Sequence, residues 1–298
     1  MSELSPGLRW GIEQRLEFIE FRLFWENGIN RSDITNFFGV SVPQASNDLK
    51  QYQEIAPENI QYDRSLKRYF ATDQFKPRFL QPDATRYLTQ LNSIARGTLV
   101  TGETWLFDLP DFAAIPLPRR NIDPAVLKHV LSNVRGGRSL EIRYQSLSAK
   151  RPKPQWRWIT PHAFGFDGMR WHTRAFCHID GHFKDFLLPR ILDVKGSGPP
   201  GAQPADDVAW TETAEVALKP HPALTEDQKK VVAADFGMTK GLLYVQVKLA
   251  MLYYFLKRMG LNFKEQELDP QQQHIVLANP DSVHASLAKA QYKTEGAV

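Results

Sequence analysis

The sequence has little cysteine and no long hydrophobic run. A single cysteine, Cys177, excludes an internal disulfide framework. The longest apolar stretch, residues 249–256, is far shorter than the roughly 20 residues that a membrane-spanning helix needs. The opening MSELSPGLRWGIEQ has acidic residues where a secretory signal requires a basic and then an apolar run. We therefore expect a cytoplasmic protein with no membrane partner.

Signatures of catalysis and of cofactor binding are also missing. Cys177, His178 and His182 are close in sequence, but Asp180-Gly181 interrupts them. The two histidines therefore cannot lie one helical turn apart, as zinc-binding pairs do. The stretch GSGPPG lacks the Gly-Lys-Ser/Thr ending of a phosphate loop, and no paired-carboxylate signature is present. We predict a protein that is not an enzyme, with no catalytic residues, no metal and no cofactor.

What the chain does have is an uneven distribution of charge. Residues 135–195 contain 12 Lys and Arg against 5 Asp and Glu, whereas residues 1–78 contain 10 against 11. A basic block of this kind attracts polyanions. A segment with four prolines, at 107–124, and a segment rich in Pro and Gly, at 195–207, suggest boundaries. The predicted parts are residues 1–78, a helical and Pro-rich linker and dimerisation region at 79–134, residues 135–197 and residues 208–298.

The first part has the pattern of a helix-turn-helix unit. A long helix with Leu16, Ile19, Leu23 and Phe24 on its buried face is expected to end near Gly28. A short helix within 30–39 follows, capped by Asn30 or Ser32 and ended by Gly39. Ser41 then caps a second helix, whose first turn contains Pro43. Its predicted buried stripe is Val42, Ala45, Leu49 and Tyr52.

The outer face of that second helix and the hairpin after it suit DNA. Gln and Asn side chains pair with adenine edges, and Ser or Lys side chains contact bases or phosphates. The stretch NIQYDRSLKRYFAT is predicted to form a hairpin with a basic tip, as a wing on the phosphate backbone requires. The predicted DNA-binding residues are Ser41, Gln44, Ser46, Asn47, Lys50, Arg64, Lys67 and Arg68.

A further helix is predicted within residues 82–97. Tyr87, Leu88, Leu91 and Ile94 share one side of it. The sequence leaves open whether this helix joins the DNA-binding part to the rest of the chain or pairs with a second subunit.

The basic block is predicted to form an antiparallel sheet. Its most informative strand lies in GMRWHTRAFCHIDG, where Trp171, Thr173 and other apolar residues alternate with Arg170, His172 and Arg174. We assign Trp171 to the core. The opposite face has two arginines and a histidine, and we expect few acids nearby to neutralise them. Asp167-Gly168 is the turn into this strand.

This pattern resembles the WYL domain, a small sheet domain of bacterial regulators. Arg170-Trp171-His172-Thr173 corresponds to the naming strand, with His and Thr in place of Tyr and Leu, and the Arg-x-x-x-Pro element matches Arg157 to Pro161. The closing element matches Phe186, Arg190 and Ile191. Over its full length the chain is similar to the winged-helix WYL repressors of bacterial phage-defence operons of the BREX and CBASS type.

The resemblance implies an α+β multidomain protein and a sensor in its middle. It implies an N-terminal winged helix-turn-helix domain, a central small antiparallel Sm-like sheet domain, and a small α/β extension that crosses to the other subunit. WYL domains are thought to bind nucleic-acid-like or nucleotide ligands, and arginine forks suit phosphate groups. The predicted ligand-binding residues are Tyr144, Ser146, Ser148, Arg157, His172, Arg174 and Arg190.

We therefore predict a homodimeric, sequence-specific repressor of a phage-defence operon. Its partners would be double-stranded operator DNA with an inverted repeat and a nucleic-acid or nucleotide effector that releases the repressor. The alternative is a non-specific nucleic-acid clamp within a larger DNA-processing complex, whose N-terminal helices contact protein. Activation in place of repression also stays open, because some WYL proteins activate.

Overall fold

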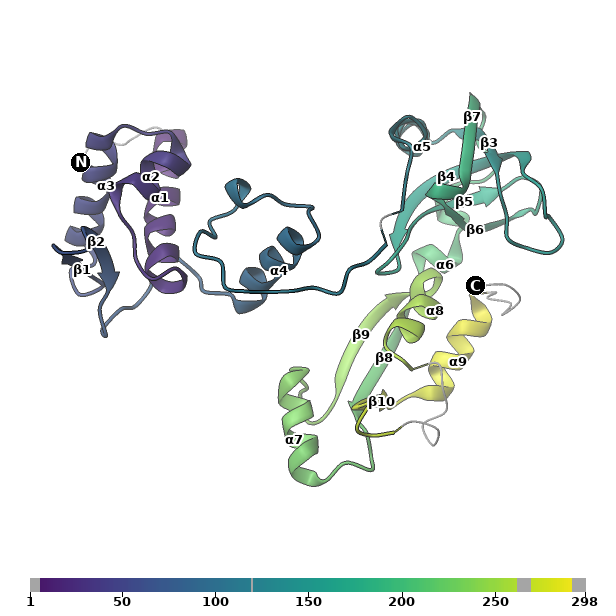
Figure 1. The fold of residues 1–298 in the computed structure, drawn as a ribbon. Helices are drawn as coiled ribbons and strands as arrows, with labels where there is room; N and C mark the ends of the chain where they lie inside the picture. The colour runs from purple at the N-terminus through teal and green to yellow at the C-terminus, as the bar shows by residue number, and fades with distance from the viewer. Residues whose placement is uncertain (1–5, 119, 262–268, 291–298) are drawn as a thin grey trace. The chain divides into compact units, whose positions relative to one another are not determined.

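The fold comes from a computed structural model that describes residues 6–118, 120–261 and 269–290. The chain divides into two compact units, Met1–Pro118 and Arg119–Val298 (Figure 1). No helix in the described ranges combines the length and the apolar character needed to cross a membrane.

The first unit has helices before and after a two-stranded hairpin. The strands β1 and β2 are antiparallel, with Ile60 opposite Ala71 and Asp63 opposite Arg68. The elements in chain order are α1 (Pro6–Trp25), α2 (Arg31–Phe38), α3 (Val42–Ile55), β1 (Ile60–Asp63), β2 (Arg68–Ala71), α4 (Ala84–Ala95) and the 3₁₀ turn η1 (Thr101–Glu103).

Local capping chemistry fixes the helix-turn-helix. Asn30 and Asp33 form a capping box at the start of α2, and Gly39 ends the helix in the left-handed conformation at φ 65°. The Ser41 side chain accepts a hydrogen bond from Gln44 N at the start of α3, with Pro43 in the first turn. These caps are where the sequence predicts them, with Asn30 as the cap of α2.

The core of this unit confirms most of the predicted apolar stripes. Leu16, Ile19 and Leu23 of α1 pack with the other buried residues of the cluster, which include Ile34, Ala45, Leu49 and Tyr52. Two assignments to the buried faces are wrong. Phe24 is 43% exposed, and Val42, in the first turn of α3, is 57% exposed.

Buried charges on α1 and directly after it attach the later segments of the unit. The Glu20 carboxylate accepts hydrogen bonds from the backbone N of Arg78, Phe79 and Leu80 and from the Tyr52 hydroxyl. Glu26 likewise accepts hydrogen bonds from backbone N atoms at 107 and 108. Because a buried carboxylate is stable only when it is hydrogen-bonded, these contacts fix the chain after the hairpin to α1.

The helix α4 belongs to the first unit. Its Leu91 is buried with Phe21 of α1, Leu80 and Leu106. Leu88, which the periodicity places on the same side, is 61% exposed. One side of α4 therefore packs within the chain itself.

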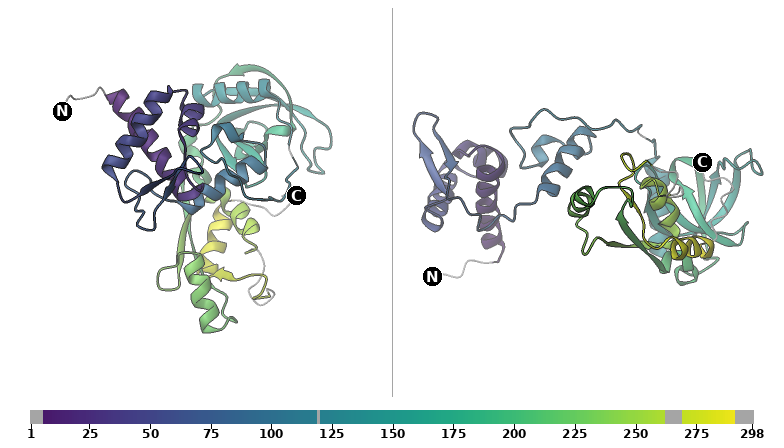
Figure 2. Two further views of the ribbon diagram at one scale, coloured as in Figure 1. Left: turned by 60° about the vertical axis from the view of Figure 1, so that its left-hand side comes forward. Right: turned by 90° about the horizontal axis from the view of Figure 1, so that it is seen from below.

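The second unit begins with a helix against a five-stranded antiparallel sheet. The strand order is β6-β5-β4-β3-β7, and buried residues of α5 such as Val126 and Val130 join Leu140, Ile142 and Ile159 in its core. Figure 2 shows this helix beside the sheet in two further views. The elements are α5 (Pro124–Gly136), β3 (Ser139–Tyr144), β4 (Gln155–Phe166), β5 (Trp171–Cys177), β6 (His182–Leu187), η2 (Leu188–Arg190) and β7 (Ile191–Gly198).

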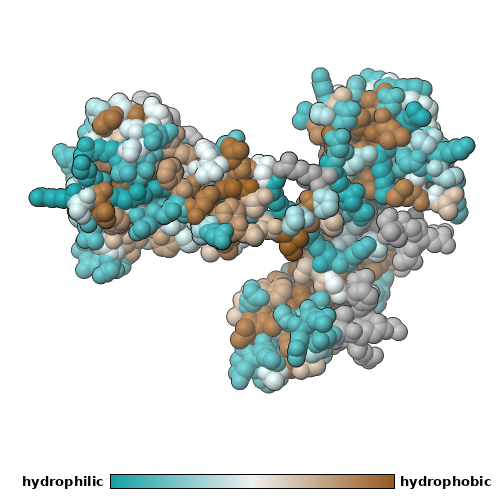
Figure 3. Space-filling view, in the orientation of Figure 1, coloured by the Kyte–Doolittle hydropathy of each residue, from teal (hydrophilic) through white to brown (hydrophobic). Residues whose placement is uncertain are grey.

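A smaller three-stranded sheet with helices completes the unit. Its strands are antiparallel in the order β10-β8-β9, and Leu252 and Leu256 of α8 are buried against it. The elements are η3 (Pro204–Asp206), α6 (Val208–Thr211), β8 (Thr213–Pro220), α7 (Glu226–Asp235), β9 (Leu243–Lys248), α8 (Leu249–Arg258), β10 (Ile275–Leu277) and α9 (Pro280–Lys289). The space-filling view shows a mostly hydrophilic surface with separate apolar patches (Figure 3).

Two expectations about the second unit are wrong. Residues 195–198 of the expected linker are the end of β7, so only the segment from 199 onward leaves the sheet. Trp171 is 48% exposed and packs on Phe166, with ring centroids 4.8 Å apart, so it is not a core residue. Trp171 is the first residue of β5, whereas Thr173, Ala175 and Cys177 further along the strand are fully buried.

Candidate nucleic-acid interface and ligand site

The outer face of α3 presents the polar residues that the sequence predicts there. Asn47 and Lys50 are exposed, and Gln44 and Ser46 are partly exposed. The Lys50 ammonium lies 3.8 Å from Glu54, but with both side chains largely exposed such a pair holds the lysine only weakly. Within the described residues, no hydrogen bond engages the Asn47 side chain. Among the predicted DNA-binding residues of α3, Asn47 and Lys50 are therefore the most available to a duplex.

Three other predicted DNA-binding side chains already have partners in the helix. The Ser41 hydroxyl caps α3, and the Ser46 hydroxyl donates to Val42 O at 2.9 Å. Gln44 Nε2 donates to Asp48 Oδ1 at 2.9 Å. Any contact that these residues make with DNA has to be compatible with these bonds.

Asp48 and Arg15 are residues that the sequence reasoning missed. Asp48 is 1% exposed, and Arg15 of α1 donates to it from Nε at 2.7 Å and from Nη2 at 3.2 Å. This bidentate pair fixes the orientation of α3 on α1, and through Asp48 it also orients Gln44. In the sequence, the position of Asp48 among the polar residues predicted to face outward was the only indication of this ion pair.

The hairpin has the turn that a basic wing requires. Asp63 Oδ1 accepts hydrogen bonds from Ser65 N at 2.8 Å, from Leu66 N at 2.9 Å and from the Ser65 hydroxyl at 2.6 Å. These bonds, above all the one from the Ser65 hydroxyl, lower the pKa of Asp63. Arg64 and Lys67 are exposed in the turn, and Lys67 adopts a positive φ of 50°.

Arg68 does not lie at the tip of the hairpin, where the sequence reasoning placed it. It is the first residue of β2, and its Nη2 donates to Gly28 O at 2.8 Å and lies 3.8 Å from Asp33. Gly28 has a φ of 100°, and a Cβ there would lie 2.4 Å from Tyr69 O. Arg68 thus holds a tight approach between the end of α1 and β2, which is a structural task within the domain.

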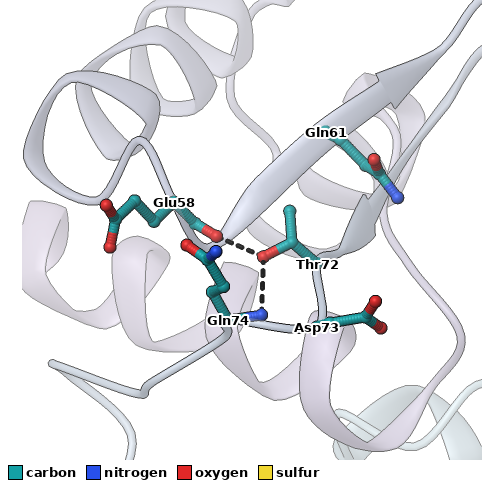
Figure 4. Close-up of a pocket in the computed structure, with 5 residues that line it drawn as sticks. All are labelled: Glu58, Gln61, Thr72, Asp73 and Gln74. Atoms are coloured by element: carbon teal, nitrogen blue, oxygen red, sulfur yellow. Dashed lines mark hydrogen bonds between the residues drawn. The ribbon is translucent and has the colours of Figure 1, made fainter.

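The first unit also has a small polar hollow at the base of the hairpin (Figure 4). It is lined by Glu58, Gln61, Thr72, Asp73 and Gln74. The Thr72 hydroxyl donates to Glu58 O, and Gln74 N donates to the Thr72 hydroxyl at 3.2 Å. Two acidic side chains and no basic one line this hollow, so its charge opposes a phosphate.

The predicted ligand-binding residues of the sheet separate into groups, of which the first is Tyr144, Arg157 and Arg190. Arg157, on β4 opposite Ile142 of β3, lies over the Tyr144 ring with 5.4 Å from Cζ to the centroid. Burial raises the pKa of the Tyr144 hydroxyl, which a hydrogen bond from Leu187 N and the nearby Arg190 guanidinium partly oppose. Tyr144 is 6% exposed and therefore stays protonated.

Arg157 has an unusual environment. It is 3% exposed, and its Nε and Nη2 atoms are buried without a hydrogen-bond partner among the described residues. A buried guanidinium without a carboxylate is costly, and a bound anion would remove that cost. Arg157, over the Tyr144 ring, and Arg190, near the Tyr144 hydroxyl, are therefore suited to a phosphate group.

Ser146 and Ser148 lie in the loop between β3 and β4. The Ser146 hydroxyl accepts a hydrogen bond from Ser148 N at 3.1 Å, and the Ser148 hydroxyl accepts one from Lys150 N at 3.3 Å. Both hydroxyls therefore shape the loop, and Ser148 is exposed.

Arg174 and His172 form a second group with different surroundings. Arg174 is 6% exposed, and it donates to Asp207 from Nε at 2.7 Å and from Nη2 at 3.0 Å, and to Asp185 from Nη1 at 3.3 Å. His172 Nε2 lies 3.1 Å from Asp167 Oδ2. The expectation that this strand has few acids near it is wrong, because folding brings three carboxylates to it.

Comparison with known protein families gives three consecutive matches. Residues 11–93 match the BrxR transcriptional regulator winged helix-turn-helix domain, residues 125–195 match the WYL domain, and residues 213–283 match the BrxR transcriptional regulator C-terminal dimerization domain. The DNA-binding transcriptional repressor CapW of Stenotrophomonas maltophilia is 40% identical over 94% of this chain and 93% of its own length. The chain belongs to the CapW family.

Other members of the CapW family are similarly related. The CapW repressors of Pseudomonas aeruginosa and of Escherichia coli strain KTE188 are 38% and 37% identical, over 95% and 94% of this chain and 94% and 93% of their own. Among solved structures, proteasome accessory factor B/C (PafBC) of Arthrobacter aurescens aligns over 94% of this chain and 49% of its own, with 16% identity and a TM-score of 0.24. That likeness is too low to carry an argument.

The family matches confirm the WYL resemblance and the fold class. The CapW-family chain has an N-terminal winged helix, a central antiparallel sheet and a C-terminal domain of mixed helix and sheet. Tyr144, Arg157, His172, Arg174 and Arg190 all lie within the stretch that matches the WYL domain. Asp207 lies between that stretch and the one that matches the dimerization domain.

Proposed function

We propose that this chain is a sequence-specific DNA-binding repressor that acts as a homodimer on an inverted repeat. The observation that carries the proposal is the exposure of Asn47 and Lys50 on α3 together with Arg64 and Lys67 on the wing, in a stretch similar to a winged helix-turn-helix domain. Relatives named as repressors and the match to a dimerization domain support it. Two heads related by a two-fold axis would contact two half-sites.

The proposal includes a ligand that releases the repressor. A nucleotide or nucleic-acid phosphate would bind between Arg157 and Arg190, beside the Tyr144 hydroxyl. The support is the buried guanidinium of Arg157, two nitrogen atoms of which have no partner among the described residues. A ligand shifts operator affinity only when it binds the released form more tightly than the DNA-bound form. The operon that it controls would belong to phage defence, and the protein would act in the cytoplasm.

A gel-shift titration tests this function. The purified protein is titrated against its own upstream intergenic DNA and against a random duplex of equal length, each with and without a short single-stranded oligonucleotide. We expect tight binding to the upstream DNA that the oligonucleotide releases. Equal and strongly salt-dependent binding to both duplexes would instead indicate a general nucleic-acid binder and would overturn the proposal.

Asn47→Ala separates base contacts from folding in the same assay. Asn47 is exposed, so its replacement should leave the unfolding midpoint unchanged. Loss of a bidentate base contact costs about 1–3 kcal/mol, or roughly 5- to 150-fold in affinity for the upstream DNA. Asn36→Ala, the same change at an exposed position of α2, is the control. Equal affinity of the Asn47 variant and the wild type would remove Asn47 from the interface.

A further inference from the structure

Polar side chains join the five-stranded sheet to the C-terminal domain within the second unit. On the sheet they come from β4, β5 and β6, and on the other side from α8 and from the residue before α6. That residue is Asp207, which is 1% exposed and belongs neither to the five-stranded sheet nor to the three-stranded sheet. It is therefore the point at which the chain passes from one domain to the next.

Asp207 receives two partners from the sheet. Arg174 of β5 donates to it twice, at 2.7 and 3.0 Å, in the fork geometry that suits a carboxylate. His162 Nε2 lies 2.9 Å from Asp207 Oδ2. The β4–β5 register shifts between Pro161 and Ala163, so His162 is the extra residue of a bulge, a feature that redirects a side chain. Burial alone would raise the pKa of Asp207, but the bonds from His162 and Arg174 lower it to about 2.

A second connection comes from α8. The Tyr254 hydroxyl donates to Asp185 Oδ2 at 3.1 Å, and Asp185 lies opposite Arg174 in the β5–β6 register and also binds it. The Tyr254 ring lies 5.0 Å from the His172 ring. Arg174 thus contacts one carboxylate that belongs to the linker and another that binds α8.

Close packing makes this joint specific. A Cβ at Gly165 of β4 would lie 2.9 Å from Met251 Sδ of α8 and 3.8 Å from the Trp210 ring of α6. The His162 ring meets the Trp210 ring edge to face, with centroids 6.0 Å apart. α6 and α8 therefore lie directly on the face of β4 and β5 opposite to α5.

We propose that Asp207, Arg174, Asp185 and Tyr254 form a latch that transmits the state of the sheet to the C-terminal domain. Arg174 is then a positioning residue of the repressor and not a ligand-binding residue. The inference rests on the proposed function, because the transmitted signal is the ligand bound near Arg157.

The physical basis is the cost of separating buried charges. Removal of one partner leaves the other partner buried with an uncompensated charge. The five-stranded sheet and the C-terminal domain therefore either move together or exchange their charged partners completely. A network of this kind has discrete arrangements and does not deform gradually, which is what coupling between two sites requires. Asp207 connects β4 and β5 with the start of the C-terminal domain through its bonds with His162 and Arg174.

Two conservative variants test the latch, each with a matched control. Tyr254→Phe removes only the hydroxyl that binds Asp185, and Asp207→Asn keeps the shape but removes the charge that Arg174 binds. The controls are Tyr244→Phe, where Tyr244 is 56% exposed, and Asp235→Asn at an exposed site on α7. The full-length protein is used throughout, with a short oligothymidylate as the probe ligand and the upstream duplex as operator.

The decisive quantity is the ratio of operator Kd with saturating oligothymidylate to operator Kd without it. Allosteric coupling typically changes affinity about 5- to 150-fold. We expect both latch variants to bind oligothymidylate with a Kd within about twofold of wild type. Their Kd ratio should nevertheless be at least about fivefold smaller than that of wild type, while both controls keep the wild-type ratio. A change in folding alone would not produce this pattern, since both single affinities are measured. Unchanged ratios in both variants would overturn the latch.

A second measurement separates failure of the latch from failure of the proposed function. If the wild-type protein binds the operator but oligothymidylate does not release it, the probe-driven part of the proposed function fails. Hydrogen exchange then tests the latch without a ligand. Asp207→Asn should speed exchange at β5 and α8 together relative to Asp235→Asn, because the joint opens as one unit. Unaltered exchange at both elements would refute the joint itself.

Discussion

Replacement of Arg157 by Met should stabilise the free protein, which is the opposite of what most substitutions in a core do. Met keeps much of the length of the side chain and removes the charge. Arg157 is 3% exposed, and two of its nitrogen atoms are buried without hydrogen-bond partners in the described part of the chain. Each unsatisfied buried polar group costs about 1–3 kcal/mol, and more when it is charged.

The loss on the other side is smaller. The contact of the Arg157 guanidinium with the Tyr144 ring, 5.4 Å from the centroid, contributes about 1–2 kcal/mol when desolvated. In the Arg157→Met variant, a contact of the thioether sulfur with the same ring recovers roughly 0.3–1.5 kcal/mol. We therefore expect a net gain of about 1–3 kcal/mol in the free energy of unfolding, in the range found when buried charges are replaced by apolar side chains.

Urea unfolding followed by tryptophan fluorescence measures this gain. Trp156 and Trp158 flank Arg157 on β4 and report on the second unit. Arg143→Met is the control, because Arg143 is an exposed arginine on the adjacent strand and its replacement should change stability by less than about 0.5 kcal/mol. In the presence of a bound oligonucleotide the order should reverse, since only the wild type gains from the phosphate. A destabilised Arg157→Met protein would show that the guanidinium is satisfied in the free state and would refute the anion site.

Three further predictions concern other buried charges. Between about pH 5 and pH 2 the free energy of unfolding of the second unit should fall by roughly 2 kcal/mol more in wild type than in Asp207→Asn. The folded-state pKa of Asp207 is about 2, so its stabilising contribution is present above the usual pKa and is lost as the pH falls through the lowered one. Urea midpoints measured across this pH range test the prediction. Glu20→Gln should destabilise the first unit by about 2–4 kcal/mol, since the carboxylate accepts several buried hydrogen bonds, and a thermal midpoint equal to that of exposed Glu54→Gln or higher would contradict this. Arg68→Ala should lower the stability of the first unit by about 1–3 kcal/mol, measured by urea unfolding, whereas the same change at Arg64 should lower DNA affinity without affecting stability.

Local patterns in the sequence were enough to predict much of the first unit. The caps of α2 and α3 depend on residues a few positions apart, so Asn30, Gly39 and Ser41 could be recognised without knowledge of the tertiary fold. The buried charges could not. Glu20 and Arg22 of α1 and Glu26 just after it are fully buried, and segments far along the chain hydrogen-bond to the two carboxylates. Helical periodicity contains no information about such later segments.

The second unit shows more clearly what the sequence alone does not predict, because two of its buried arginines have opposite surroundings. Arg157 and Arg174 both lie on neighbouring strands of a basic block, and in sequence neither differs from a residue that grips phosphate. The register places Asp185 opposite Arg174, and the linker brings Asp207 to it, so its charge is already neutralised. Arg157 lies opposite Ile142 and beside a protonated phenol, so its charge is not neutralised within the protein. Net charge counted along the chain therefore predicts an attraction for polyanions as a property of the whole block. Only the pairing of strands shows which guanidinium is left for the phosphate of the proposed ligand.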